Sequence, residues 1–111
     1  MGCGLITQTY KMDEEKKVGV KHDHGKLLMG LVPHEAVVSL AQVLTFGANK
    51  YSPNGWQKLP NAKSRYEDAM LRHFYAYKAG ELIDPESGLS HLKHALTNLA
   101  FLVYFEESEE K

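Results

Sequence analysis

The apolar residues of this chain recur at helical spacing in three stretches that are separated by turn-forming residues. The first stretch follows Pro33, which suits the first turn of a helix, and Glu35 complements the positive end of that helix. Its apolar positions repeat every three or four residues: Val37, Leu40, Ala41, Leu44 and Ala48. We therefore predict a helix that weakens at Gly47 and Asn49, followed by a loop that contains Trp56.

The second stretch runs from Tyr66 to Glu81, and its helix is expected to begin near Ser64. One face collects mostly apolar and aromatic side chains: Tyr66, Met70, His73, Phe74 and Tyr77. Glu81 continues the same face. We expect the helix to stop by Asp84, because Pro85 disfavours helical geometry in the residue that precedes it.

The third stretch, from Leu89 to Glu106, is apolar on nearly all sides except for one polar row. That row consists of His91, His94 and Asn98. A helix of this kind is buried on several sides, either in the core or at a subunit contact, so we expect a homo-oligomer. The predicted fold is all-α, a compact bundle of about three main helices.

Three segments are expected along the chain. Residues 1–20 form an irregular N-terminal arm, residues 21–106 a single helical domain, and residues 107–111 a frayed acidic tail. Within the start of the domain, the polar cluster from Lys21 to Lys26 is read most simply as a turn, which Asp and Gly favour. A chain of 111 residues is long enough for one modest core, and oligomerisation would help to stabilise it.

Composition narrows the class of protein. The formal net charge is −1, and the thirteen basic residues are scattered along the chain, so no nucleic acid polymer is expected as a partner. The single cysteine, Cys3, excludes an internal disulfide and fits a reducing cytoplasm. The N-terminal residues lack the pattern of a signal peptide, and no apolar run approaches the length that spans a membrane. A cytoplasmic location is expected.

Two carboxylates stand three residues apart at the predicted end of the second helix. On a helix, this spacing points Glu81 and Asp84 the same way, so that they can share one divalent cation. Oxygen ligands suit Mg²⁺ or Mn²⁺, especially when substrate phosphates supply the remaining oxygens. The alternative is a pair of solvated acids at a helix end.

The histidines leave three interpretations open. His91 and His94 can be metal ligands, phosphate donors or core histidines with satisfied hydrogen bonds, and Asn98 shares their face. Histidines at short helical spacing also suit Zn²⁺, so a zinc site built on His73, His91 and His94 is the rival to magnesium.

Basic and aromatic side chains elsewhere suit a nucleotide. Candidates for phosphate contacts are Lys26, Lys50, Arg65 and Arg72. The chain contains no Walker loop and no glycine-rich dinucleotide fingerprint, so phosphates would be held from helices rather than by a cradling turn. Trp56 lies in a turn-rich loop, where it is either a hydrophobic plug or a flat surface for a base.

Several short motifs, in this order, resemble the N-terminal domain family of phage-type dATP/dGTP diphosphohydrolases. They are Lys21-x-Asp23-x-Gly25-Lys26, Leu31-x-Pro33, Phe46-Gly47-Ala48-x-Lys50-Tyr51, Trp56, Arg65-Tyr66-x-x-Ala69, Arg72-His73, Gly80-Glu81-x-x-Asp84-Pro85-Glu86-Ser87-Gly88 and His91-x-x-His94-Ala95. The resemblance covers residues 20–105, and it departs from the usual Asn-Trp pair at Asn54-Gly55-Trp56. The family is similar in turn to the MazG-like all-α nucleoside triphosphate pyrophosphohydrolases, which bind magnesium through two acidic pairs. This sequence offers one clear pair of that spacing, Glu81 and Asp84, and His91 and His94 stand where the second pair is expected.

The resemblance implies hydrolysis of dGTP or dATP to the monophosphate and pyrophosphate, by a phage protein in the host cytoplasm. It implies that Glu81 and Asp84 hold Mg²⁺ or Mn²⁺ and that one of them, or a histidine of the cluster, orients the attacking water. The remaining implied roles concern the substrate. Cationic contacts to phosphate come from Lys26, Lys50 and Arg72, base stacking from Tyr51 or Trp56, and further polar contacts from His73 and Asn98.

Two alternatives of other classes remain open. A short chain of this kind can keep the helical fold as a non-catalytic module that binds a nucleotide or a host protein. It can also be a zinc-dependent hydrolase that uses the histidine cluster.

Overall fold

The computed structural model describes residue 22 and residues 24–109. The chain divides into two units, Met1–Pro33 and His34–Lys111. In the first unit, the described residues include one short 3₁₀-helix, η2 (Met29–Leu31). The predicted arm at residues 1–20 lies outside the described residues. The expected domain bounds, residues 21–106, remain a prediction.

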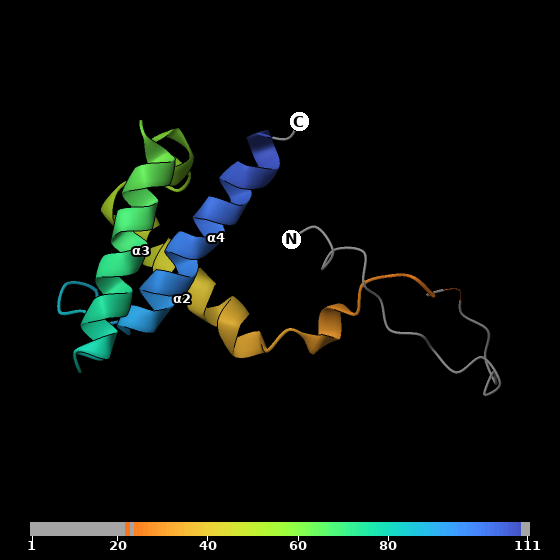
Figure 1. Cartoon of the computed structure of the whole chain (residues 1–111), viewed down its shortest axis with the longest axis horizontal. Helices are drawn as coiled ribbons and strands as arrows, with labels where there is room; N and C mark the ends of the chain where they lie inside the picture. The colour runs from red at the N-terminus through yellow and green to blue at the C-terminus, as the bar shows by residue number, and fades with distance from the viewer. Residues whose placement is uncertain (1–21, 23, 110–111) are drawn as a thin grey trace. The chain divides into compact units, whose positions relative to one another are not determined.

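The second unit is built from helices. In chain order they are α2 (His34–Lys50), the 3₁₀-helix η3 (Gly55–Lys58), α3 (Ala62–Lys78) and α4 (His91–Glu109). Helix α4 packs against both α3 and α2, and α2 crosses it at a steep angle (Figure 1). Over the described residues there is no sheet, only one isolated antiparallel bridge between Ile83 and Ser90. The all-α prediction with three main helices is confirmed for this part of the chain.

Helix α2 follows the apolar pattern of the sequence. It begins at His34, directly after Pro33, with Glu35 in its first turn and Lys50 in its last turn. Both charges complement the helix dipole. The helix continues through Gly47 to Lys50, and this places Lys50 at the start of the loop that contains Trp56.

The end of α3 corrects the sequence prediction, because the helix stops at Lys78 and does not reach Glu81. The backbone N–H of Gly80 donates to Tyr77 O at 3.0 Å, and the N–H of Glu81 donates to Ala76 O at 3.0 Å. This pair of bonds is a Schellman motif, which requires a left-handed residue at the position of Gly80, where φ is +103°. Glu81 and Asp84 therefore lie in the loop after α3, and the argument from helical spacing does not apply to them.

The loop from Glu81 to Ser90 is compact and ends in a helix cap. Its two sides are joined by hydrogen bonds from Asp84 N to Leu89 O at 2.8 Å and from His91 N to Leu82 O at 2.9 Å. Ser90 Oγ accepts the N–H of Lys93 at 3.1 Å, which satisfies one free donor of the first turn of α4. The loop thus holds Asp84 in a defined position beside α4.

Helix α4 also extends beyond its expected end. It continues to Glu109, whose Oε1 accepts Lys63 Nζ of α3 at 3.0 Å. The prediction of a frayed tail from residue 107 is therefore wrong for residues 107–109, and residues 110–111 lie outside the described part of the chain.

The most buried side chains of the described residues lie on one face of α4. They are His91, His94, Ala95, Thr97 and Asn98. The hydroxyl of Thr97 donates to Lys93 O, and the amide of Asn98 donates to His94 O, so both polar groups are satisfied within the helix.

Aromatic rings cover the neighbouring part of the same face. The indole of Trp56 stacks on Phe101 with a centroid distance of 4.4 Å and an interplanar angle of 14°. Tyr66 of α3 contacts Phe101 as well, and its hydroxyl donates to Trp56 O at 2.8 Å. Trp56 therefore packs as a hydrophobic plug, one of its two expected roles.

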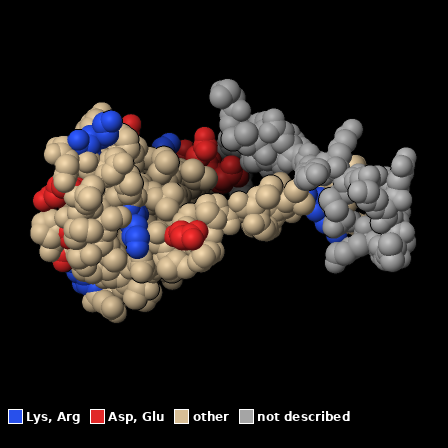
Figure 2. Space-filling view, turned by 90° about the horizontal axis from the view of Figure 1, so that it is seen from below, with Lys and Arg blue, Asp and Glu red and all other residues tan. Residues whose placement is uncertain are grey.

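On the face shown in Figure 2, side chains of both charges lie scattered over a mainly uncharged surface. None of the helices that the structure describes has the length and apolar character needed to cross a membrane.

Candidate functional site

A pocket of about 570 Å³ opens between α2, α3, α4 and the loop that contains Trp56. This volume lies in the range of small-molecule sites. Its polar and aromatic lining residues are Phe46, Lys50, Tyr51, Ser52, Trp56, Arg65, Tyr66, His73, Asp84, Glu86, His94 and Phe101. The pocket thus combines cations, aromatic rings, carboxylates and imidazoles, which together can bind a polar aromatic ligand.

Three histidines gather beside this pocket. His91 joins two side chains: its Nε2 lies 2.8 Å from Oε1 of Glu81, and its Nδ1 lies 2.8 Å from Nδ1 of His73. The ring of His73 stacks on that of His94, with centroids 4.5 Å apart and an interplanar angle of 12°. Helices α3 and α4 thus bring together histidines that are far apart in the sequence.

His94 is the second centre of hydrogen bonding. Its Nε2 lies 2.6 Å from Ser87 Oγ and 3.4 Å from Asp84 Oδ2. Asp84 is largely buried, and its Oδ2 also accepts the N–H of Ser87 at 3.3 Å. Phe46 of α2 meets the His94 ring edge-on at 6.4 Å. One imidazole, one carboxylate and one hydroxyl are therefore held in a fixed arrangement at the pocket wall.

Burial keeps two of the histidines neutral at physiological pH. It lowers the pKa of His73 to about 4, and the neighbouring His94 adds to this effect, whereas Asp84 opposes it. Burial also lowers the pKa of His94, and it outweighs the attraction of the Asp84 carboxylate. Neutral imidazoles can both donate and accept hydrogen bonds, which suits them to bind and orient a ligand.

The cationic side of the pocket is formed by Lys50 and Arg65. Lys50 Nζ is paired with Glu86 Oε2 and lies 5.1 Å from the centroid of the Tyr51 ring. Arg65, on the first turns of α3, lines the same pocket. These two side chains can supply positive charge to a bound phosphate.

The pocket includes some of the residues that the sequence singled out and leaves out others. It is lined by Lys50, Tyr51, Trp56, His73, Asp84 and His94. Four others do not line it. Glu81 and His91 lie behind His73, Arg72 is exposed on α3, and the Asn98 amide is bonded to its own helix. Lys26 belongs to the first unit, so it is not placed relative to this pocket.

Two further residues of the site have no separate role in the sequence predictions. Ser87 contacts His94, and Glu86 pairs with Lys50, whereas the sequence singles out both only as members of the motif that begins at Gly80. Their position directly after Asp84-Pro85, in a segment rich in chemically active side chains, is the signal that could have identified them.

The expected metal set is not assembled in the described residues. Among them, no group of three or more His, Cys, Asp and Glu side chains is placed to hold one ion together. Glu81 and Asp84 instead each contact a different histidine. The donor set therefore does not form a complete centre for Mg²⁺, Mn²⁺ or Zn²⁺, and the metal remains a prediction.

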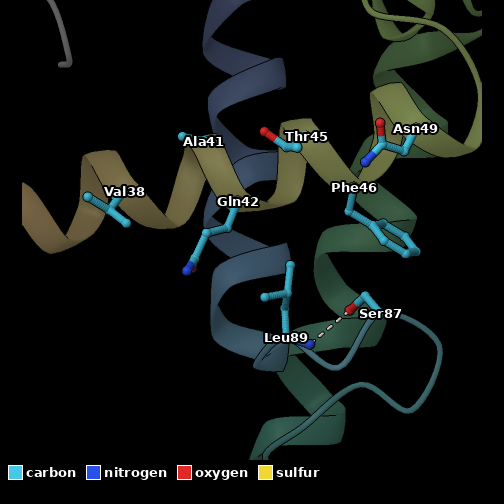
Figure 3. A pocket seen from close by; sticks show the side chains of 8 residues that line it. All are labelled: Val38, Ala41, Gln42, Thr45, Phe46, Asn49, Ser87 and Leu89. Carbon is cyan, nitrogen blue, oxygen red and sulfur yellow. Dashed lines mark hydrogen bonds between the residues drawn. The ribbon is translucent and has the colours of Figure 1, made fainter.

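A second hollow of about 510 Å³ lies on the other side of Phe46. Val38, Gln42 and Thr45 follow one side of α2 there, and Ser87 and Leu89 come from the loop before α4 (Figure 3). Ser87 Oγ accepts the N–H of Leu89 at 3.1 Å, so this hydroxyl ties the loop together next to His94. Phe46 lines both hollows, and its ring contacts His94 of the histidine cluster.

The fold and the site together define an all-α protein with a histidine–carboxylate cluster beside a pocket of ligand size. The family model for the N-terminal part of dATP/dGTP diphosphohydrolases matches residues 16–111, and the chain belongs to this family. A relative from Salmonella phage PMBT28, named dATP/dGTP diphosphohydrolase, is 34% identical over 86 residues. The aligned region covers 78% of this chain but only 29% of that relative, so the chain spans less than a third of the relative's length. No solved structure shows a significant match to the chain.

Proposed function

We propose that the pocket binds a purine deoxynucleoside triphosphate, dGTP or dATP, and that the chain takes part in its hydrolysis to the monophosphate and pyrophosphate. The observation that carries the proposal is the lining of the pocket, where Lys50 and Arg65 lie with aromatic rings and the histidine–carboxylate cluster. Family membership and the name of the phage relative support the choice of substrate.

Each part of the pocket suits one part of such a ligand. Lys50 and Arg65 would neutralise phosphate oxygens, and the exposed ring of Tyr51 offers a flat surface to the base. Asp84 and His94 would orient the hydrogen bonds of water near the phosphates. Mg²⁺ or Mn²⁺ is the expected cofactor, and it would supply charge neutralisation at the phosphates when bound. Of the expected ligands, Asp84 and His94 line the pocket, whereas Glu81 and His91 do not.

A non-catalytic nucleotide-binding module is the second candidate. It is favoured by the pairing of Glu81 and Asp84 with separate histidines, because this pairing leaves no complete metal-binding group in the described residues. A nucleotide that binds the native state would raise the melting temperature without any turnover. The zinc-dependent hydrolase remains the third candidate, and elemental analysis of the purified chain tests it.

The test is a panel of deoxynucleoside triphosphates with Mg²⁺, Mn²⁺, Zn²⁺ or no metal, in which the products are identified. We expect monophosphate and pyrophosphate from dGTP or dATP. Lys50→Ala and Arg65→Ala should each lower kcat/KM about tenfold or more, because each removes a charge-assisted contact to phosphate. Lys58→Ala is the matched control, since Lys58 is exposed and does not line the pocket.

Two substitutions of aspartate by asparagine complete the test. Asp84→Asn should abolish turnover, whereas Asp68→Asn, on the exposed side of α3, should leave it unchanged. Binding without turnover in every condition would favour the non-catalytic module. Absence of both binding and turnover would contradict the proposal.

We further propose that the chain forms a homo-oligomer through α4. Leu92, Leu99 and Val103 recur on a helix face away from the buried histidines, and each is more than 40% exposed. Among the described residues, only Ala95 is a buried apolar residue, so a single copy leaves most of its large apolar side chains in water. We expect light scattering after gel filtration to give a multiple of the single-chain mass.

Leu99→Glu should reduce that mass to the mass of one chain, because it places a charge in the proposed contact. Tyr75→Glu, which replaces an exposed ring on α3, is the control and should leave the mass unchanged. A single-chain mass for the unaltered protein would contradict the oligomer.

A further inference from the structure

One hydrogen-bonded chain of side chains links the protein surface to the pocket. Glu81 is more than half exposed, His91 behind it is 5% exposed, and His73 lines the pocket. The two contacts that join them, Glu81 Oε1 to His91 Nε2 and His91 Nδ1 to His73 Nδ1, are both 2.8 Å long. Both ring nitrogens of His91 and Nδ1 of His73 take part in these contacts, and this determines the positions of the hydrogens.

The carboxylate at one end determines the direction of the hydrogen bonds. An ionised Glu81 can only accept, so Nε2 of His91 carries a hydrogen. Two nitrogens 2.8 Å apart share one hydrogen, and a His91 ring that carries a single hydrogen, on Nε2, has none left for its Nδ1. Nδ1 of His73 must therefore be the donor. The opposite arrangement requires two hydrogens, and thus a positive charge, on the buried His91 ring, and the only carboxylate in contact with that ring among the described residues is Glu81, which is more than half exposed.

This assignment leaves Nε2 of His73 without a hydrogen. No described residue provides a hydrogen-bond partner for that nitrogen, and every side-chain nitrogen or oxygen that is fully buried in the described residues does have one. Nε2 is therefore open to a ligand. One face of the ring is covered by His94, and a nitrogen lone pair lies in the plane of the ring, so a ligand in the pocket meets this nitrogen at the ring edge.

We propose that Glu81 and His91 are positioning residues that hold His73 in the Nδ1–H form, and that His73 Nε2 accepts a hydrogen bond from an O–H group in the pocket. That group belongs either to a water molecule or to the sugar of a bound nucleotide. The presence of a nucleotide in this pocket rests on the proposed function. A bare imidazole nitrogen cannot bind an ionised phosphate oxygen, since both are acceptors. The phosphates are thereby directed to Lys50 and Arg65.

The hydrogen positions can be measured on the full chain by ¹H–¹⁵N correlation spectra of its histidine rings at neutral pH. The expected result for His73 is a protonated Nδ1 and a bare Nε2, without the averaging seen in free imidazole. A protonated Nε2 on His73 in the unaltered protein would overturn the proposal, because Nδ1 of His73 would then accept the hydrogen bond from His91 instead of donating it.

A matched pair of variants tests the positioning role. Glu81→Ala removes the exposed acceptor, and the Nε2 resonance of His73 should shift toward the average of the two neutral forms. Glu67→Ala removes an exposed carboxylate of α3 that takes no part in the hydrogen bonds from Glu81 to His73, and it should leave the resonance unchanged. If Glu81→Ala causes no shift although the protein remains folded, Glu81 has no positioning role and the proposal fails.

The ligand is tested with dGTP and with its 2′,3′-dideoxy analogue. Saturation with dGTP should shift the His73 Nε2 resonance toward the protonated range. The same shift with the dideoxy analogue assigns the donor to water, and its loss assigns the donor to the 3′-hydroxyl. If dGTP at saturation shifts other resonances of the pocket but not that of His73 Nε2, the proposal is refuted. Failure of any nucleotide to bind would instead refute the proposed function, while the spectrum of the free protein still decides the hydrogen positions.

Discussion

Replacing Trp56 by alanine is expected to lower the free energy of unfolding by about 3 kcal/mol, the lower end of the range for large aromatic residues, because the indole is only partly buried. The indole stacks on Phe101 and meets Tyr104 edge-on at 4.9 Å, so its loss opens a cavity between the loop and α4. Phe101, which contacts both Trp56 and Tyr66, would lose one of its packing partners, whereas the hydrogen bond from the Tyr66 hydroxyl to the backbone of residue 56 is retained by an alanine. The effect should be seen in urea unfolding followed by circular dichroism, because the variant has no tryptophan fluorescence.

Tyr51→Ala is the control for this experiment. Its ring belongs to the same turn-rich loop but is 74% exposed, so the change should be within about 0.5 kcal/mol. Both variants need the same protein concentration, because oligomerisation would alter the apparent stability. Equal effects of the two substitutions would contradict the role of Trp56 as a plug.

Lowering the pH from about 6.5 to about 4 is expected to destabilise the folded chain. The pKa of His73 is lowered to about 4 in the folded state, chiefly by burial, whereas the unfolded chain takes up that proton near 6.5. The unfolded state thus binds more protons in this window, and stability decreases as the pH falls through it. A shift of this size in a fully buried group would correspond to about 3 kcal/mol, and solvent screening of the partly exposed ring reduces this to about 1–2 kcal/mol. The lowered pKa of His94 acts in the same direction.

Chemical unfolding at a series of pH values measures this dependence. His73→Gln should weaken the slope between pH 4 and 6.5, because one titrating group is removed. His34→Gln, at an exposed position at the start of α2, is the control and should leave the slope unchanged. If the free energy of unfolding does not change between pH 4 and 6.5, the conclusion that His73 and His94 are kept neutral in the folded state is contradicted.

The existence and order of the helices followed from local patterns. Helix α2 begins where Pro33 and Glu35 indicate, and the apolar repeat of α4 is present as expected. The error at the end of α3 also has a local cause. Glu81 continues the apolar periodicity, but Gly80 offers a left-handed cap that satisfies the last carbonyls, and this cap ends the helix at Lys78.

The candidate site was predicted only in part, because its geometry depends on contacts between segments that are distant in the sequence. Asp84, His94 and Lys50 could be chosen by residue type and by motif, and all three line the pocket. The partners of each could not be chosen in the same way. Ser87 reaches His94 only because the loop folds back. Arg65 lines the pocket and Arg72 does not, although residues seven apart share one face of α3, because Arg65 lies two turns nearer the loop that contains Trp56.

The sequence by itself determined the helical class, the family and the set of reactive side chains, since these depend on periodicity and on the order of short motifs. Only the tertiary structure decided how those side chains are paired. It placed Glu81 on His91 and Asp84 on His94, where helical spacing had suggested one shared cation. The physical reason is that a hydrogen bond depends on distances of about 3 Å between atoms of different helices and loops, and such distances are set by packing rather than by local sequence.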